Sequence, residues 1–405
     1  MGRATPLAEA EGPLWVGIDA GKTNHHLAVV DALGEVLFSQ RVPNDQAAIE
    51  EAIAAITASE VRVSWAVDLT SATSALLLAL LTAADQDVVY IPGRTVNRMA
   101  GAFSGEAKTD AKDAVTIANT ARMRRDFLPA RPKPELVAEL VLLTGHRADV
   151  NADWVRGVSR LRQLLAGIFP ALEREFDFTT RSALVLVERY QTPKQIRRTG
   201  SARLAAYLAT RDVRQATDMA ARAVSAAKSQ TIGLLGQDTA AKLISEIATD
   251  LLRLRDRLKG LDTKIKEAFS RHPQAEVILS LPGMGPQLGA EFAIAVGDLS
   301  TFRDAGHLAA YAGLAPVPRD SGRISGNLHR PKRYNRRLRR VFYMSALSSL
   351  KTTGPNRDYY ARKRSEGKKH QKALMALARR RIDVLWALLR DDRMFTPSAP
   401  AVQAA

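Results

Sequence analysis

The sequence predicts an α/β domain at the N-terminus, followed by a long region built almost entirely of helices. Two patterns support this fold class. Short apolar segments with strand character alternate with helical segments over roughly the first 125 residues. Over residues 135–270, apolar side chains instead recur every three or four residues, which is typical of helices. The 405 residues are enough for two or three domains.

The elements of the α/β domain follow from its apolar segments. Three strands joined by tight turns are expected at 15–18, 27–30 and 36–38. Isoleucines at helical spacing then predict a helix over 45–58. The later elements alternate in type: a strand at 61–67, a helix at 71–83, a strand at 88–91, and helices at 95–99 and 112–124. This order is that of a ribonuclease-H-like (RuvC-like) domain.

The helical region contains one long apolar seam. Seven apolar residues from Ile247 to Ala268 follow one another in steps of four and three, which is the a/d pattern of three coiled-coil heptads. Such a seam packs either on another helix of the same chain or on a second copy. The preceding stretch, 180–227, is less regular because Pro193 and Gly200 interrupt it.

A third region begins near residue 275. The segment 281–286 (LPGMGP) separates two helical runs, as in a helix-hairpin-helix motif. Gly283 and Gly285 would let backbone N–H groups approach a phosphate, although a plain tight turn is the alternative. Beyond it we expect a helix at 308–315, a basic loop at 316–334, and helices at 336–350 and 356–390.

These patterns divide the chain into five parts. The expected parts are a flexible N-terminus (1–13), the α/β domain (14–130), a helical coiled-coil region (131–272), a mostly helical C-terminal domain (273–393) and a disordered tail (394–405).

Positive charge is concentrated in the C-terminal part. The chain has a net charge of +17, and residues 319–393 hold 22 Lys or Arg against 6 Asp or Glu, a net charge of +16. A basic block of this length indicates a nucleic-acid partner. The absence of cysteine excludes disulfides, thiolate zinc sites and a cysteine nucleophile.

No membrane segment or secretory signal is expected. The longest apolar stretch, 74–84, is about half of the roughly 20 residues that a spanning helix needs. We therefore expect a cytoplasmic, nucleoid-associated protein.

Four carboxylates stand where a metal site would need them. Asp19 and Asp68 end two predicted strands, and Asp110 and Asp113 share one helix face at i, i+3. Converging carboxylates repel one another unless cations neutralise them, and two Mg²⁺ ions would do so while clamping a phosphodiester. Taken singly, each Asp could simply cap a turn.

Two other interpretations of the first strand end are weaker. A phosphate-binding P-loop needs glycine at position 16, which is Val16, so Lys22 and Thr23 do not complete that motif. An actin-like ATPase would need further glycine-rich phosphate turns downstream. His25 and His26 are expected to form a solvent-exposed pair.

The chain resembles the transposases of the insertion sequence 110 family, the bridge-RNA-guided recombinases. Six motifs carry the resemblance: 17–19 (GID) with Lys22 and His26, 108–113 (KTDAKD), 281–286 (LPGMGP), 308–316 (LAAYAGLAP), 321–322 (SG) and 332–340 (KRYNRRLRR). It implies a DNA transposase with an Asp-Glu-Asp-Asp metal set, a helical linker and a nucleophilic serine.

Carried onto this sequence, the resemblance assigns the catalytic and Mg²⁺-binding acids to Asp19, Asp68, Asp110 and Asp113. The second acid is usually Glu in the family, so Asp68 is one methylene shorter. The implied nucleophile is Ser321; its rivals are Ser325 and, in an apolar helical run typical of packing residues, Ser345 and Ser348.

The expected nucleic-acid contacts are basic side chains together with the two glycines: Lys22, Lys108, Gly283, Gly285, Arg323, Arg330, Lys332, Arg333, Arg336 and Arg337. Arg339 and Arg340 either join them or pair with acids. The implied partners are donor and target DNA and a noncoding guide RNA, bound by a homodimer that assembles into a tetramer on DNA.

Two alternatives remain open from the sequence. One is a structure-selective endonuclease that uses the acids with water and no serine. The other is an inactive nucleic-acid-binding scaffold.

Overall fold

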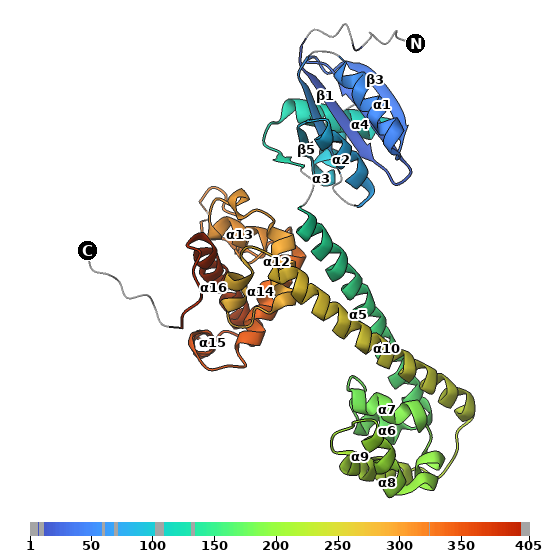
Figure 1. Ribbon diagram of the computed structural model, residues 1–405. Coiled ribbons are helices and arrows are strands. Elements are labelled where there is room, and N and C mark those ends of the chain that lie inside the picture. The colour runs from blue at the N-terminus through green and yellow to red at the C-terminus, as the bar shows by residue number, and fades with distance from the viewer. Residues whose placement is uncertain are drawn as a thin grey trace. The chain divides into compact units, whose positions relative to one another are not determined.

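The computed structural model describes residues 7, 12–58, 61–68, 72–101, 109–130, 134–323 and 325–397. The chain forms two compact units, Met1–Pro134 and Glu135–Ala405. Figure 1 shows a sheet with helices in the first unit and helices throughout the second. No helix in the described part of the chain is long and apolar enough to cross a lipid bilayer.

The first unit contains a mixed six-stranded sheet with strand order β3-β2-β1-β4-β5-β6. The strands are β1 (Leu14–Ala20), β2 (Asn24–Val30), β3 (Val36–Pro43), β4 (Val63–Val67), β5 (Val88–Tyr90) and β6 (Leu128–Pro129). β1 is antiparallel to β2 and parallel to β4, which is itself parallel to β5. The predicted α/β class is confirmed, and the short antiparallel edge strand β6 is an addition to it.

Helices cover both faces of this sheet. They are α1 (Gln46–Thr57), the short 3₁₀ turn η2 (Ala72–Ser74), α2 (Ala75–Ala83), α3 (Gly93–Ala100) and α4 (Asp110–Met123). Val16 and Ile18 of β1 share an apolar core with α1 and α2. Ala66 of β4 shares a second core with α3 and α4. Because strand side chains alternate between faces, Gly17 and Asp19 lie on the α4 side.

Gly17 permits the close approach of α4 to β1. A Cβ atom at this position would lie 2.1 Å from the carbonyl oxygen of Ala114 and 2.3 Å from the amide nitrogen of Ala118. Any side chain would therefore push α4 away from the sheet. The absence of a side chain at Gly17 thus lets α4 pack closely on β1 at Ala114 and Ala118.

Two long helices, α5 (Glu135–Ile168) and α10 (Gln237–Ser270), pair along their lengths in the second unit (Figure 1). An ion pair between Arg147 and Asp262 joins them. Of the predicted seam, Leu251, Leu261, Ile265 and Ala268 are buried. Of the two alternatives, the structure shows packing within the chain.

Four shorter helices lie between α5 and α10: α6 (Pro170–Glu175), α7 (Arg181–Arg189), α8 (Pro193–Thr210) and α9 (Ala216–Lys228). They form an apolar core with the adjoining ends of the two long helices. The irregularity expected at Gly200 is a kink inside α8, where the backbone adopts φ +74°.

The C-terminal part has its own core. Its elements are α11 (Ala275–Ser280), α12 (Pro286–Val296), η3 (Leu299–Thr301), α13 (Ala305–Tyr311), β7 (Val317–Pro318), β8 (Leu328–His329), α14 (Arg336–Ser349), α15 (Pro355–Ser365) and α16 (His370–Arg390). The expected helix at 308–315 is wrong at its end, because α13 stops at Tyr311. The last helical stretch is also two helices, because the chain turns at Gly367 with φ +80°.

Candidate active site and nucleic-acid interface

Strand register brings two of the four predicted carboxylates together. Asp19 on β1 lies opposite His26 on β2, so both side chains are on the α4 side of the sheet. In the parallel pair β1–β4, Ile18 lies opposite Val67, so Asp19 and Asp68 follow at neighbouring strand ends. The Ala20 amide donates a hydrogen bond to Asp68 Oδ1 at 3.5 Å.

The other two carboxylates lie in the first turn of α4. Thr109 caps this helix by accepting a hydrogen bond from the Lys112 amide at 3.2 Å. Asp110 and Asp113 follow the cap, where the positive end of the helix dipole stabilises acidic side chains. The cap therefore places both acids in the first turn of α4.

Electrostatic interactions connect the strand ends with α4. Burial raises the pKa of Asp68, the Ala20 amide opposes the rise, and the charge of Asp113 adds to it. Burial also lowers the pKa of His26, while the charge of Asp110 acts in the opposite direction. Asp68 is thus within electrostatic range of Asp113, and His26 is within electrostatic range of Asp110.

These pairs do not form a closed coordination sphere. Among the described residues, no three or more His, Asp or Glu side chains are grouped closely enough to hold a metal ion. The chemistry of the donors nevertheless fits Mg²⁺, which prefers carboxylate oxygens. Asp68 is half-buried, and this burial is the main cause of its raised pKa.

We expect Asp68→Asn to raise the melting temperature of the protein at pH 7 in a buffer with EDTA. A carboxyl with a raised folded-state pKa destabilises the fold once pH exceeds that pKa, and asparagine removes this penalty. As the pH falls below the unfolded-state value of about 3.9, Asp68 becomes protonated in both states. The advantage of the variant should therefore shrink, as thermal unfolding at several pH values would show.

Asp126→Asn is the matched control in the same unit. The Asp126 pKa is lowered by its exposed ion pair with Arg124, so this substitution should not raise the melting temperature. An Asp68→Asn variant that melts at or below the wild-type temperature at pH 7 would contradict the prediction.

The expectation of an exposed histidine pair is wrong for His25. This side chain is 1 % exposed, and it lies opposite Ala20, on the face covered by α1 and α2. Burial lowers its pKa. Of the two predicted lysine contacts in this unit, Lys22 is exposed in the turn after β1, and Lys108 lies outside the described residues.

Ser321 lies in the loop of the β7–β8 hairpin, which interrupts the predicted basic loop. The Arg319 amide donates to the Asn327 carbonyl oxygen at 2.9 Å, and the Asn327 amide donates to Asp320 Oδ1 at 2.9 Å. These bonds close the hairpin on either side of the serine. Ser321 is exposed, and within the described residues its hydroxyl has no hydrogen-bond partner.

The rival serines differ in their surroundings. Ser345 is fully buried and accepts a hydrogen bond from Arg381 Nη2 at 2.6 Å, which makes it a packing residue, as expected. Ser348 is half-buried on the same helix, α14. Ser325 is as exposed as Ser321, so burial alone does not separate these two.

The two predicted turn glycines have different environments. At Gly283 the backbone has φ +81°, and a Cβ atom would lie 2.6 Å from the Ser345 carbonyl oxygen and 2.8 Å from the Ser349 amide nitrogen. Gly283 therefore packs against α14. Gly285 is exposed at the start of α12, and a Cβ atom there would have no described neighbour within 4 Å.

A buried arginine supports this turn. Nη2 of Arg381 donates to the Pro282 carbonyl oxygen at 2.5 Å as well as to Ser345. Arg381 is 1 % exposed, and burial lowers its pKa to about 10. The Arg381 side chain thus joins the turn to α14 through hydrogen bonds, and the sequence pattern did not single out this residue.

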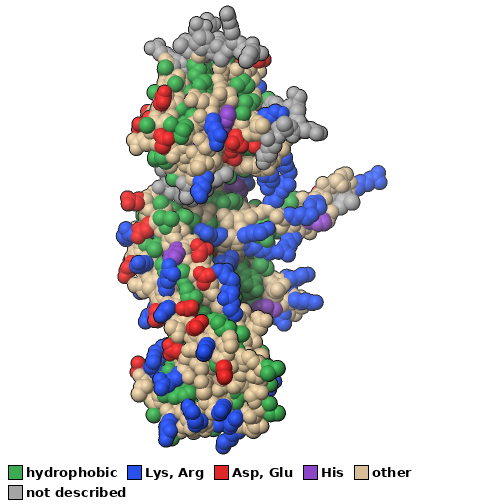
Figure 2. All heavy atoms as spheres, turned by 90° about the vertical axis from the view of Figure 1, so that its right-hand side faces the viewer, with side chains coloured by type: hydrophobic (Ala, Val, Ile, Leu, Met, Phe, Trp, Pro, Cys, Tyr) green, Lys and Arg blue, Asp and Glu red, His purple; other side chains and the backbone are tan. Residues whose placement is uncertain are grey.

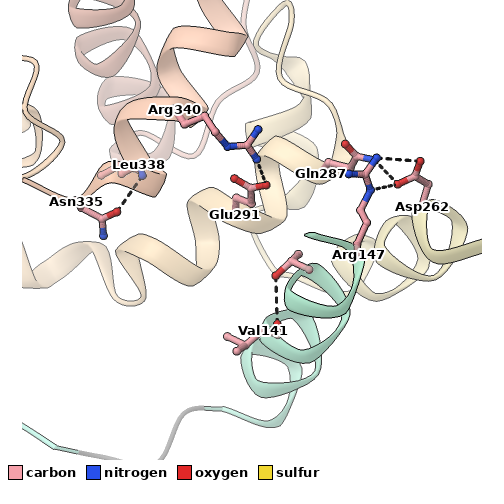
Figure 3. A network of polar contacts seen from close by, with 9 residues as sticks. Val141, Arg147, Asp262, Gln287, Glu291, Asn335, Leu338 and Arg340 are labelled. Atoms are coloured by element: carbon pink, nitrogen blue, oxygen red, sulfur yellow. Dashed lines mark hydrogen bonds and ion pairs between the residues drawn. The ribbon is translucent and has the colours of Figure 1, made fainter. Parts of the chain in front are cut away.

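Most predicted basic contacts are solvent-exposed. They are Arg323, Arg330, Lys332, Arg333, Arg336 and Arg337. Figure 2 shows Lys and Arg side chains over much of one face, including segments that project from it. Arg340 forms an ion pair with Glu291, one of its two predicted alternatives (Figure 3). Near the start of α12, Asp262 accepts hydrogen bonds from both Arg147 and Gln287 (Figure 3).

The sequence reasoning missed the structural roles of Gly17 and Arg381. One signal for Gly17 was present: Ala114 and Ala118 are small residues four apart on one helix face, a pattern that permits close packing on glycine. Arg381 lies in a basic run, 379–381, and nothing in the sequence distinguishes it from its exposed neighbours.

Two family models match the chain. The DEDD transposase model of IS110, described as a transposase, matches residues 16–170, and the transposase model of the IS116/IS110/IS902 family matches residues 275–361. These matches define the chain as a transposase, an enzyme class that recombines DNA.

Similar full-length proteins come from insertion elements. An IS116 protein of Streptomyces clavuligerus is 56% identical over 97% of this chain and 98% of its own length. An IS900 protein of Mycobacterium paratuberculosis is 50% identical over 97% of this chain and 99% of its own length. An IS110 protein of Streptomyces coelicolor is 34% identical over 96% of this chain and 96% of its own length. This chain belongs to the IS110 family of insertion-sequence transposases.

Proposed function

We propose that this transposase cuts and rejoins donor and target DNA through a transient phosphoserine bond at Ser321. The observation that carries the proposal is the setting of this serine. It is exposed in a hairpin loop with Arg319 and Arg323 beside it in the chain, whereas Ser345 is buried. A nucleophile needs access to the phosphate and positive charge around it.

The chemistry balances without an external energy source. The Ser321 oxygen attacks phosphorus, a P–O(serine) bond forms, and the bond to one deoxyribose oxygen breaks. The serine proton leaves with a base, and the departing oxygen takes up a proton. Attack by the hydroxyl of another DNA end reverses these steps, restoring a phosphodiester and the free serine.

The acidic set of the first unit, whose arrangement supports a ribonuclease-H-like fold, is proposed to hold Mg²⁺. The residues that would hold it are Asp19, Asp68, Asp110 and Asp113. When bound, the cation supplies positive charge to phosphate oxygens. Without it, the charges of Asp68 and Asp113 repel a phosphate as well as each other.

Specificity is proposed to come from a noncoding guide RNA that pairs with donor and target DNA. Such a division leaves sequence reading to base pairing, while the protein contacts the backbone. The exposed arginines and lysines of the C-terminal part, and the exposed Gly285 at the start of α12, suit backbone contacts. A homodimer that assembles into a tetramer on DNA completes the proposal.

A search for a covalent protein–DNA adduct tests this function. The full chain, its guide RNA and the DNA that flanks its element would be mixed with Mg²⁺, quenched in denaturant, digested and analysed by mass spectrometry. We expect a nucleotide remnant on the peptide that contains Ser321.

The other outcomes correct the proposal or overturn it. A remnant on Ser325 would keep phosphoserine chemistry and move it to that residue. Cutting that needs Asp19 and Mg²⁺ but leaves no adduct would establish an endonuclease that uses water. If the protein binds nucleic acid but gives neither an adduct nor cutting, the result would support the inactive nucleic-acid-binding scaffold.

A further inference from the structure

A basic pocket lies at the foot of the β7–β8 hairpin, where the hairpin meets α14 and α16. Its volume is about 690 Å³. One part of its wall is polar and is formed by His329, Arg330, Arg339, Tyr343, Gln371 and Lys372. Within the described residues no Asp or Glu lines it, so its positive charges are not neutralised locally.

Arg339 is the most constrained cation of the pocket. Its Nη1 atom is buried and has no hydrogen-bond partner in the described part of the chain. Nη2 has only the sulfur of Met375, at 4.0 Å. A buried guanidinium N–H group without an acceptor is costly, since arginine keeps its charge and all its donors. An anion in the pocket would supply the missing acceptor.

The orientation of Arg339 is set in advance by Tyr334. The Arg339 guanidinium lies over the Tyr334 ring, 4.7 Å from its centroid. The ring in turn lies against Gly313, where a Cβ atom would be 2.4 Å from Tyr334 Cγ. A hydrogen bond with Arg330 and the positive charge of Arg339 lower the pKa of the Tyr334 hydroxyl. The Arg339 guanidinium is therefore stacked on the Tyr334 ring, which itself packs against Gly313.

We propose that this pocket binds a backbone phosphate of the nucleic-acid strand, with Arg339 as its main donor and Lys372 as a second cation. This proposal rests on the proposed function in one respect: it takes nucleic acid as the ligand of the protein. Pro316 in the pocket wall and Ser321 are five residues apart, which is at most about 18 Å of extended chain. Ser321 does not line the pocket, so the proposed phosphate site lies within reach of the hairpin loop without including the serine.

The test compares Arg339→Gln with Arg340→Gln in the full chain. Both remove one charge from adjacent positions of α14, but Arg340 pairs with Glu291 and does not line the pocket. Affinity for a 30-nucleotide strand, as DNA and as RNA, would be measured by fluorescence anisotropy at several KCl concentrations. We expect Arg339→Gln to weaken binding about tenfold and to reduce the salt slope by about 0.7, the value for one phosphate on a single strand.

Arg340→Gln should leave the salt slope unchanged, and Lys372→Gln, an exposed position, should reduce it. If Arg339→Gln loses affinity for DNA only, for RNA only or for both, the result identifies which backbone occupies the pocket. Equal effects of Arg339→Gln and Arg340→Gln, or no effect of either, would overturn the proposal. Because binding is measured without cleavage, a missing Ser321 adduct would leave this comparison intact. Melting temperatures of the unbound variants would show whether weak binding reflects unfolding.

Discussion

Ser321→Ala is expected to reduce DNA strand cleavage by about 10³-fold or more while leaving DNA affinity within about twofold of wild type. The exposed hydroxyl makes no described contact that holds the fold together, so its loss removes only the attacking atom. Single-turnover cleavage of flanking element DNA, at saturating protein with guide RNA and Mg²⁺, would measure the effect. Anisotropy with the same DNA would measure affinity.

Two variants make this result specific. Ser325→Ala removes an equally exposed hydroxyl from the same hairpin loop and should retain cleavage within a few fold. Asp19→Asn should abolish cleavage whether serine or water attacks, so it shows that the assay reports this enzyme. Cleavage by Ser321→Ala at the wild-type rate, together with loss in Asp19→Asn, would contradict the serine mechanism and support the endonuclease.

The α/β domain could be predicted because its signals are local. Strands β1, β2, β4 and β5 begin and end within three residues of the predicted ranges, whereas β3 continues to Pro43, five residues beyond its predicted end. Strand β6 escaped prediction because it has two residues and pairs only through its neighbour β5. The packing partner of the α10 seam could not be predicted either. An a/d pattern indicates that one face of a helix is packed, but it does not identify the element on which that face packs.

The candidate site was predictable in its residue types and less so in their geometry. Asp19 and Asp68 end neighbouring strands as their positions suggested. That His25 is buried while His26 lies on the α4 face follows from strand alternation, which separates any two consecutive residues. The pocket beside Arg339 was not predictable, because α16 and the hairpin approach each other only in the folded chain.

The turn at Gly283 gives the second large expected effect. Gly283→Ala should destabilise the second unit by about 3 kcal/mol or more, lowering its melting temperature by about 10 °C. Alanine at φ +81° is strained, and its Cβ would meet the α14 backbone at 2.6 and 2.8 Å, where no flexible side chain can yield. The displaced helix also carries Ser345, one of the two acceptors of the buried Arg381. Thermal unfolding measures the loss.

Gly285→Ala separates packing from phosphate binding at the same turn. Its backbone has φ −86°, and its Cβ would meet no described atom within 4 Å, so the cost should stay under about 1 kcal/mol. If the turn binds phosphate through its exposed amides, Gly285→Ala should weaken DNA binding at nearly normal stability. A Gly283→Ala variant that melts normally but binds DNA poorly would reverse the assignment, placing Gly283 at the phosphate and leaving α14 free to adjust.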